Sequence, residues 1–579
     1  MSQYRNRRPS LGIHLPLVLL TLTTMTACGD DDSPSDTPDA GTDVAADADA
    51  AAPDVSGTTD VDAATDATAE TDVTQFPIDP RFTEIANAVA LDLADSNADA
   101  ASIAIWLDGE IIWVGGFGAL TPDGRPIDEN TQFMIGSDTK KIAAIALLQA
   151  VEDGRISLED TIAEVVPDLE MENAPEFLQA SAHHLMSHQG GIMDGVEVTS
   201  DTADEDLFNF IFGEFARTYV SLVEPGRIWN YANPNFSLVG FLSQEVDADE
   251  RVWAEIATED IFVPLNMSQT VARKSDVSDN YMPGIGFASA SDTTIGPVNL
   301  DDTWESAFVR PAGLVWSTPS DQMRLAEFLV DGNDEVLSAA LRDAITTEQI
   351  AIYPDIPGGY GYGMFVGRGL SLGVNNYYDI PVWSHGGNTL THSSAFYILP
   401  EQRFAISILS NGQGDDFTRT LVAAVSSLVE LPQPSTPPDV AFNPDDLDAL
   451  VGTYNDPDNA GRLIITREGD SLVLDAPDLD AFGVPYESEM TRQSTRVWLM
   501  NIQEQDIDFA FIDGPNGEMY LRNRALVAVR AATDSKERPD LQPVLTANAV
   551  EQLRNALRRA AFVPTLTSWW YTRENTGGP

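Results

Sequence analysis

The chain has 579 residues, of which 91 are acidic and only 32 basic, so its formal net charge is -59. This charge excludes nucleic acid as a partner, because a phosphate backbone would be repelled rather than neutralised. A hydrophobic fraction of 43% is enough for packed cores, so most of the chain is expected to be globular. The acidic, lysine-poor composition fits either a salty environment or a general bias toward solubility.

The amino terminus has the features of an export signal. Three arginines fall within residues 1–10, an apolar stretch follows, and small residues precede Cys28, the only cysteine in the sequence. The apolar stretch is shorter than the about 20 residues of a membrane span. MTAC resembles the lipobox of bacterial lipoproteins, which implies a lipoprotein signal at 1–28 and an exported protein, lipid-anchored in the cell envelope through Cys28. The alternatives are an ordinary signal peptide and a single helical anchor.

Residues 29–75 contain no lysine, arginine or aromatic residue and are rich in Asp, Ala and Thr. Such a segment cannot bury a core, so we expect a disordered, self-repelling acidic tether.

Folded structure is expected from about residue 76. Residues 81–95 have apolar side chains at helical spacing. Residues 101–118 predict two strands joined by Asp108-Gly109, a dipeptide that favours a tight two-residue turn. The run 139–154 is apolar on nearly every side and ends at Gly154, which predicts a buried helix with a glycine at its C-terminal cap.

Ser137 lies at the start of that predicted helix, and Lys140 follows one turn later on the same face. A serine is a poor nucleophile unless another group takes its proton, and a buried lysine can do so if its pKa is lowered. The helix N-terminus also offers backbone N–H groups to a developing oxyanion. The structural alternative is that Ser137 merely caps the helix while Lys140 extends to solvent, with Lys141 a solvated or ion-paired neighbour.

Two further motifs change this balance. Tyr231-Ala232-Asn233 precedes an apolar helix-like run, and His385-Gly386-Gly387 precedes a predicted strand. In order, S-x-x-K, Y-x-N and H-x-G resemble the three motifs of the serine β-lactamase-related family, which contains class C β-lactamases, D,D-peptidases and esterases. The resemblance covers about residues 76–431 and implies an α+β fold, with an antiparallel sheet flanked by helices beside an all-helical part. The active site is then expected in the groove between them.

The resemblance also implies the roles of the site residues. Ser137 is the acylated nucleophile, Lys140 shares or accepts its proton, and Tyr231 passes that proton on, as a phenolate or as a hydrogen-bond relay. Asn233 orients the substrate carbonyl. The backbone N–H groups of Ser137 and of Asn388, which follows Gly387 of the third motif, form the oxyanion hole. The structural alternatives are a core tyrosine and a turn asparagine.

His385 departs from the K-T-G or K-S-G found in penicillin-active members, where a cation and a hydroxyl hold the substrate carboxylate. A histidine with a pKa near 6.5 is mostly neutral at about pH 7 and holds a carboxylate less strongly. This favours substrates without that carboxylate, unless an arginine from elsewhere supplies the charge.

Competing motifs are weaker. His184 and His188 have the spacing of two zinc ligands on a helix, but the glutamate of H-E-x-x-H is absent. No G-x-S-x-G elbow is present. The family reading requires no metal and no cofactor.

The remaining segments complete the predicted organisation. A Pro-rich linker spans 432–445, and alternating segments in 446–531 predict a small β-barrel-like domain that opens with L-x-G-x-Y. A tail with one helix candidate spans 532–579.

The sequence therefore predicts an exported serine hydrolase, an esterase or a peptidase/amidase, acting on a small ester or peptide. The alternatives are a penicillin-binding D,D-carboxypeptidase or β-lactamase, or a catalytically silent surface-binding relative. The oligomeric state stays open.

Overall fold

The computed structural model describes residues 79–531, except 196–201, 289–294, 374, 416, 439, 441, 458–459, 482, 503–504 and 525. The predictions for the lipoprotein signal with Cys28, the acidic tether and the C-terminal tail therefore lie outside the described residues.

An eight-stranded antiparallel sheet contains the hairpin that the sequence predicts. Asp108 and Gly109 both have a positive φ, 53° and 96°, which suits a tight two-residue turn between β1 and β2. The strands lie in the order β2 (Glu110–Gly118), β1 (Ala100–Leu107), β12 (Phe404–Ser410), β11 (Ser393–Leu399), β10 (Tyr377–Asn388), β9 (Phe365–Ser371), β8 (Gly359–Tyr360) and β7 (Ile350–Ala351).

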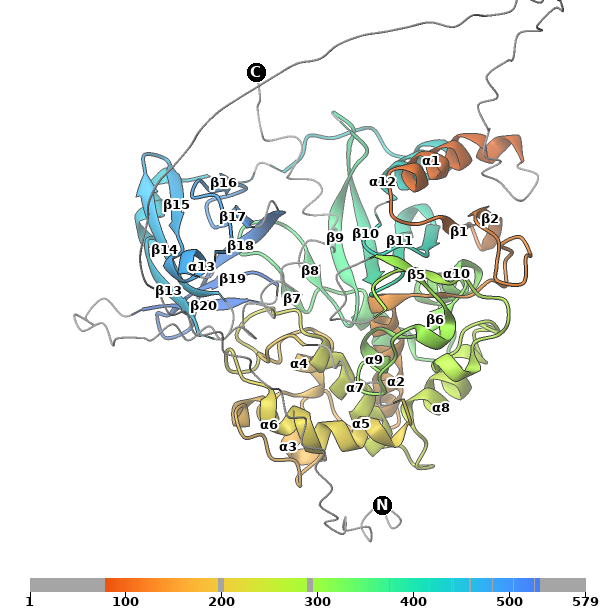
Figure 1. Cartoon of the computed structure of the whole chain (residues 1–579), viewed down its shortest axis with the longest axis horizontal. Coiled ribbons are helices and arrows are strands. Elements are labelled where there is room, and N and C mark those ends of the chain that lie inside the picture. Colours follow the sequence, from red (N-terminus) through yellow and green to blue (C-terminus); the bar gives the residue numbers. More distant parts are fainter. Residues whose placement is uncertain are drawn as a thin grey trace, which may run out of the picture. The chain divides into compact units, whose positions relative to one another are not determined.

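Helices cover both faces of this sheet (Figure 1). One face, with Ile103 and Ile105 of β1, packs against α1 (Thr83–Ala94) and α12 (Thr418–Leu428). The other face, with Ala104 and Trp106, belongs to the largest core, and α10 (Pro319–Asp331) contacts β1. Because alternate residues are buried on opposite sides, β1 reads as a continuous apolar run in the sequence.

The helical part is organised around α2 (Thr139–Glu152), which is buried without a break from Thr139 to Leu148. Gly154 follows its end with a φ of 69°, as the sequence predicts. α2 packs against α7 (Asn233–Glu245) and α9 (Arg310–Gly313). The shorter helices are α3 (Ile162–Val165), α4 (Ala182–Met186), α5 (Glu205–Phe210), α6 (Ala216–Thr218), α8 (Trp253–Ala257), α11 (Ala339–Ile345) and α13 (Pro477–Ala481). Two small two-stranded sheets pair β3 (Phe133–Met134) with β6 (Trp316–Ser317) and β4 (Gly284–Gly286) with β5 (Gly296–Val298).

A second eight-stranded sheet follows the Pro-rich segment and confirms the predicted barrel-like β region. Its first and last strands in the sequence, β13 and β20, pair with each other. A bridge between Val473 and Glu489 brings the β15 and β16 edges together. The sequence predicted most of these strands but not β16 or β20. The order is β15 (Ser471–Asp475), β14 (Gly461–Glu468), β13 (Gly452–Asp456), β20 (Val527–Arg530), β19 (Met519–Arg522), β18 (Gln505–Asp513), β17 (Val497–Ile502) and β16 (Thr491–Arg492).

The second sheet contacts the first part of the chain directly. The Tyr353 hydroxyl donates to Asp508 Oδ2 at 2.8 Å, and Ser494 Oγ donates to Asp355 Oδ1 at 2.7 Å. A small apolar cluster also includes Ile228 and Tyr520. Side chains of the β region thus reach the segment that leads to Tyr231.

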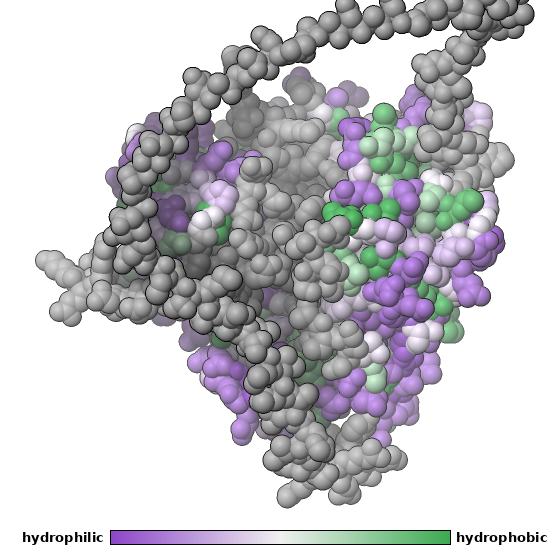
Figure 2. Space-filling view, viewed as in Figure 1, coloured by the Kyte–Doolittle hydropathy of each residue, from purple (hydrophilic) through white to green (hydrophobic). Residues whose placement is uncertain are grey.

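The visible surface mixes hydrophilic residues with small groups of hydrophobic ones (Figure 2). The exposed large hydrophobic residues in the described ranges are Leu91, Leu120, Val263 and Ile295. Among the helices that the structure describes, none has the length and apolar character of a membrane span.

Candidate active site

Ser137 lies in a short 3-10 turn, Gly136–Asp138, immediately before α2. Its side chain is partly exposed, whereas its neighbours on both sides are buried. Gly136 has a φ of 55°, and a Cβ atom on it would lie 2.6 Å from the backbone nitrogen of Asn388. Only glycine allows β10 to approach the serine this closely. The helix itself begins after Asp138, so Ser137 is not its cap residue.

Lys140 is completely buried and its ammonium has three acceptors. Nζ lies 3.0 Å from Ser137 Oγ, 2.8 Å from Asn233 Oδ1 and 2.7 Å from the carbonyl oxygen of Ala312. Burial lowers the pKa of Lys140 to about 7; the negative charge of Asp194 opposes this shift, and the positive charge of Arg524 adds to it. In its neutral form the amine can still donate to Asn233 and Ala312 while its lone pair accepts the Ser137 proton. The reading of Lys140 as a side chain that extends to solvent is therefore wrong.

The Tyr231 ring packs against the Lys140 amine. Lys140 Nζ lies 4.9 Å from the centroid of the Tyr231 ring, and the His188 ring centroid lies 4.1 Å from it. The hydroxyl is buried and has no hydrogen-bond partner among the described residues, although the charge of Arg524 and the nearby Ser137 hydroxyl both act to lower its pKa. Burial dominates and raises the pKa of Tyr231 above its ordinary value. Tyr231 is therefore a phenol at neutral pH.

Asn233 is the first residue of α7, and both ends of its side chain are engaged. Oδ1 accepts from Lys140, while Nδ2 and the backbone nitrogen both donate to Asp194 Oδ1, at 3.1 and 2.7 Å. Asp194 thus fixes the orientation of the amide that holds the lysine. The roles of Asn233 toward a substrate stay predictions.

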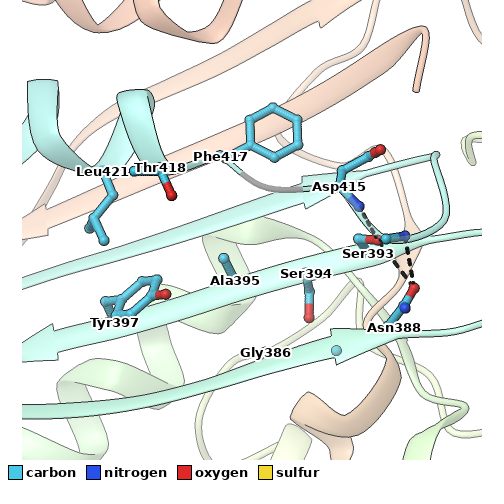
Figure 3. Close-up of a pocket in the computed structure, with 12 residues that line it drawn as sticks. Gly386, Asn388, Ser393, Ser394, Ala395, Tyr397, Asp415, Phe417, Thr418 and Leu421 are labelled. Atoms are coloured by element: carbon cyan, nitrogen blue, oxygen red, sulfur yellow. Dashed lines mark hydrogen bonds between the residues drawn. The ribbon is translucent and has the colours of Figure 1, made fainter. Parts of the chain in front are cut away.

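The third motif lies at the end of β10 and, as the sequence predicts, is followed by a strand, β11. A Cβ on Gly387 would lie 1.9 Å from the carbonyl oxygen of Ile135, so β10 can lie against the serine turn only with glycine there. The Asn388 side chain points away from the serine: its Oδ1 accepts from Gly414 N at 3.0 Å and Ser393 Oγ at 3.4 Å (Figure 3). Its backbone nitrogen remains beside the Gly136 turn.

A cavity of about 40 Å³ lies behind this strand end, between β10, β11 and the start of α12 (Figure 3). This volume has room for about three water molecules and is far smaller than the several hundred Å³ of a small-molecule site. The cavity is therefore not a substrate site.

His385 is buried, and both of its ring nitrogens have partners. Nδ1 donates to the carbonyl oxygen of Gly386 at 2.7 Å, so Nε2 accepts from the Tyr360 hydroxyl at 3.0 Å. Burial, together with nearby Lys140 and Lys141, keeps the pKa of His385 well below its ordinary value. The imidazole is neutral and supplies no cation to the site.

Lys141 forms an ion pair behind the nucleophile. Its Nζ lies 2.6 Å from Asp138 Oδ1, and neither side chain is exposed to solvent. The other carboxylate oxygen of Asp138 accepts from Ser394 Oγ at 2.6 Å. The ion-paired alternative for Lys141 is the one observed, and the pair ties the serine turn to β11.

The two histidines with zinc-like spacing have other partners. His184 Nδ1 accepts from the backbone nitrogen of Ser181 at the start of α4. His188 Nδ1 accepts from the backbone nitrogen of Ala232, beside Tyr231, at 3.2 Å. His188 therefore shapes the wall behind the tyrosine.

Comparison with known proteins places this arrangement in a family. Residues 85–428 match the family model described as Beta-lactamase. The chain belongs to the β-lactamase family. Protein flp of Staphylococcus aureus (strain NCTC 8325 / PS 47) is 23% identical over 335 residues, which cover 57% of this chain and 62% of that protein. Penicillin-binding protein 4 of Amycolatopsis lactamdurans is 22% identical over 62% of this chain and 94% of its own length.

Solved structures support the same fold. SurE superposes with a TM-score of 0.55 at 18% identity over 77% of this chain and 99% of its own. The octameric penicillin-binding protein homologue from Pyrococcus abyssi gives a TM-score of 0.50 at 18% identity, with the same coverage. The chain spans about 62% of the length of the first curated relatives that it matches. The family to which it belongs is one of serine hydrolases.

Two residues of the site were missed by sequence reasoning. Asp194 lies inside the family match, in a segment that resembles the family, but no motif marks it. Arg524 lies outside residues 85–428, in the second sheet, and its guanidinium carbon is 4.4 Å from the centroid of the Tyr231 ring. No sequence signal relates position 524 to position 231.

Proposed function

We propose that this β-lactamase-family chain is a serine hydrolase that forms an acyl-enzyme on Ser137 and acts on a small ester, peptide or amide. The observation that carries this proposal is the buried Lys140 amine, 3.0 Å from Ser137 Oγ, with a pKa lowered by burial to about 7. A lysine in that state is a base at neutral pH, and a serine beside it is a nucleophile.

The reaction proceeds in two halves. Neutral Lys140 takes the Ser137 proton while Oγ forms a bond to the substrate carbonyl carbon, and the carbonyl oxygen becomes an oxyanion. The backbone N–H groups of Ser137 and Asn388 stabilise that oxyanion. The carbon–leaving-group bond then breaks and the leaving group receives a proton. Water adds to the acyl carbon in the second half, releasing the acid and returning the proton to Ser137.

Tyr231 acts in this scheme as a hydrogen-bond relay and not as a phenolate. Burial raises the pKa of its hydroxyl, which makes the ionised form unfavourable, whereas the same burial favours the neutral amine of Lys140. The proton thus starts on the serine, resides on the lysine and reaches the leaving group through the phenol.

The wider setting is also part of the proposal. Export and lipid attachment at Cys28 rest on the sequence of residues 1–28 alone. A D,D-carboxypeptidase or β-lactamase activity is the second candidate, consistent with a relative named Penicillin-binding protein 4. A silent binding module would need no base beside Ser137, so we place it last.

The test is hydrolysis of a short-chain nitrophenyl ester and a chromogenic β-lactam by the purified full chain. Ser137→Ala is expected to abolish turnover and acyl-adduct formation by intact mass. Ser102→Ala is the control, because it removes a buried serine hydroxyl of β1 that, unlike that of Ser137, has no hydrogen-bond partner in the described structure. Turnover that survives in Ser137→Ala, or no turnover and no adduct in the wild type, would overturn the proposal.

A further inference from the structure

The turn between β19 and β20 brings an arginine of the second sheet to the catalytic tyrosine. The Arg524 carbonyl oxygen accepts from Asn230 Nδ2 at 2.8 Å, and Asn230 directly precedes Tyr231. The backbone of the turn is therefore anchored one residue away from the Y-x-N motif. This hydrogen bond holds the turn in the position from which the Arg524 side chain contacts the Tyr231 ring.

The Arg524 guanidinium is nine-tenths buried but has no ion-pair partner in the described part of the chain. Its exposed fraction is 9%. Nε and Nη1 are buried without a hydrogen-bond partner, and the side chain forms no ion pair with a described residue. The guanidinium instead lies over the Tyr231 ring, with its central carbon 4.4 Å from the ring centroid.

Of the other buried arginines, Arg310 is paired with two carboxylates and Arg522 with none among the described residues. Arg310 donates to Glu305 Oε1 through Nε and Nη2 and to Asp204 Oδ1 through Nη1. Arg522 donates to the Ile352 carbonyl oxygen and packs on the Trp229 ring, but its Nε and Nη1, like those of Arg524, are buried without a hydrogen-bond partner. A buried cation without an anion is costly, because the interaction lost with water is not replaced. What distinguishes Arg524 is its place: its donors, unpaired among the described residues, lie against the Tyr231 ring beside Lys140, where the anion of a ligand can pair with them.

The residues around Arg524 indicate that this anion belongs to the substrate. Lys140 and Arg524 lie against the same Tyr231 ring, and the charge of Arg524 helps to lower the Lys140 pKa. His385, which occupies the place of the family's carboxylate-binding cation, is neutral and has both nitrogens engaged. Arg524 supplies from the second sheet the positive charge that the third motif lacks.

We propose that Arg524 is a specificity-determining residue that binds a carboxylate carried by the substrate close to the scissile ester or amide carbonyl. A guanidinium presents a planar pair of N–H donors that matches a carboxylate. The inference rests on the proposed function of Ser137 and narrows its substrates to acyl compounds or short peptides with a nearby free carboxylate. It also makes the second sheet a part of the active site.

The experiment compares matched substrates that differ in one charge. Benzoylglycyl-thioglycolate carries the carboxylate on the leaving group, and mono(4-nitrophenyl) glutarate carries it on the acyl group; each is paired with its methyl ester. The variants are Arg524→Met and Arg524→Lys in the full chain. Arg227→Met is the matched control, because Arg227 is an exposed arginine, paired with Glu224, three residues before Asn230.

In the wild type, kcat/KM is expected to favour the charged member of at least one pair. Arg524→Met should lower kcat/KM for that member by about 10- to 100-fold and change its methyl ester by less than about threefold. Arg524→Lys should restore part of the preference, and Arg227→Met should leave it unchanged. An equal loss on both members, or a preference unaffected by Arg524→Met, would overturn the proposal.

Failure of the proposed acyl-enzyme function can be distinguished from failure of the proposed carboxylate site at Arg524. If the wild type turns over neither member of either pair, the acyl-enzyme proposal fails, and calorimetric titration with hippurate (benzoylglycine) decides the carboxylate site. Binding that Arg524→Met abolishes, with an unchanged melting temperature, supports the site. Absent binding, or equal binding by wild type and variant, refutes it.

Discussion

The proton-accepting role of Lys140 predicts a particular pH dependence of acylation. An ordinary lysine, with a pKa of about 10.4, would be neutral in only about one molecule in 2,500 at pH 7. Burial lowers the pKa of Lys140 to about 7, so about half of the molecules carry the neutral amine. The structure thus accounts for about a 1,000-fold gain in the reactive form at neutral pH.

The assay is kcat/KM for a neutral nitrophenyl ester between pH 5 and 9, after subtraction of the uncatalysed rate. Because the base must be unprotonated, activity should rise with pH through about 7 and fall about tenfold per unit well below it. Lys140→Arg, which keeps the charge but cannot lose its proton, should be inactive throughout. An acidic limb near pH 4 to 5, typical of a carboxylate, or a flat profile would refute the reasoning.

The same pKa also predicts a stability effect. Between pH 7 and about 10.4 the unfolded chain binds more protons at this lysine than the folded one, so this lysine's contribution to the free energy of unfolding rises with pH. The slope from this one group is about 1.4 kcal/mol per pH unit in the middle of that window. Lys140→Met should lose this part of the slope, measured by urea unfolding at several pH values. Identical slopes for both proteins would contradict it.

The remaining predictions concern the support of the site. Lys141→Met leaves the buried Asp138 carboxylate without its ion-pair partner and should lower the free energy of unfolding, measured in urea, by about 3 to 5 kcal/mol. The double variant Asp138→Asn/Lys141→Met should recover most of this loss. Equal losses in the single and double variants would show that the pair is not coupled. Gly387→Ala would place a methyl group on the Ile135 carbonyl oxygen, so kcat should fall at least tenfold while the far-ultraviolet circular dichroism is kept. Tyr231→Phe should slow turnover by about 10²- to 10⁴-fold without loss of melting temperature, since its hydroxyl has no hydrogen-bond partner among described residues.

Much of the fold could be read from local patterns. The Asp108-Gly109 turn, the apolar runs of β1 and α2, and Gly154 at the helix end are short-range features, and the structure confirms each of them. The barrel-like region was predicted from alternation, but β16 escaped because its two residues are too few to show a period. The three-residue spacing of Ser137 and Lys140 also predicted that they lie one helical turn apart.

The sequence by itself determined the catalytic motifs and their order, because each is set by spacing within a few residues. Only the tertiary structure decided what surrounds them. It showed that His385 is a neutral, fully bonded residue, that Asp194 orients Asn233, and that Arg524 reaches Tyr231 from a different sheet. These facts depend on strands, helices and turns from distant parts of the sequence, which burial of the hydrophobic cores brings together. Burial, which is a property of the whole fold, also lowers the pKa of Lys140 and encloses Arg524, which has no ion-pair partner among the described residues.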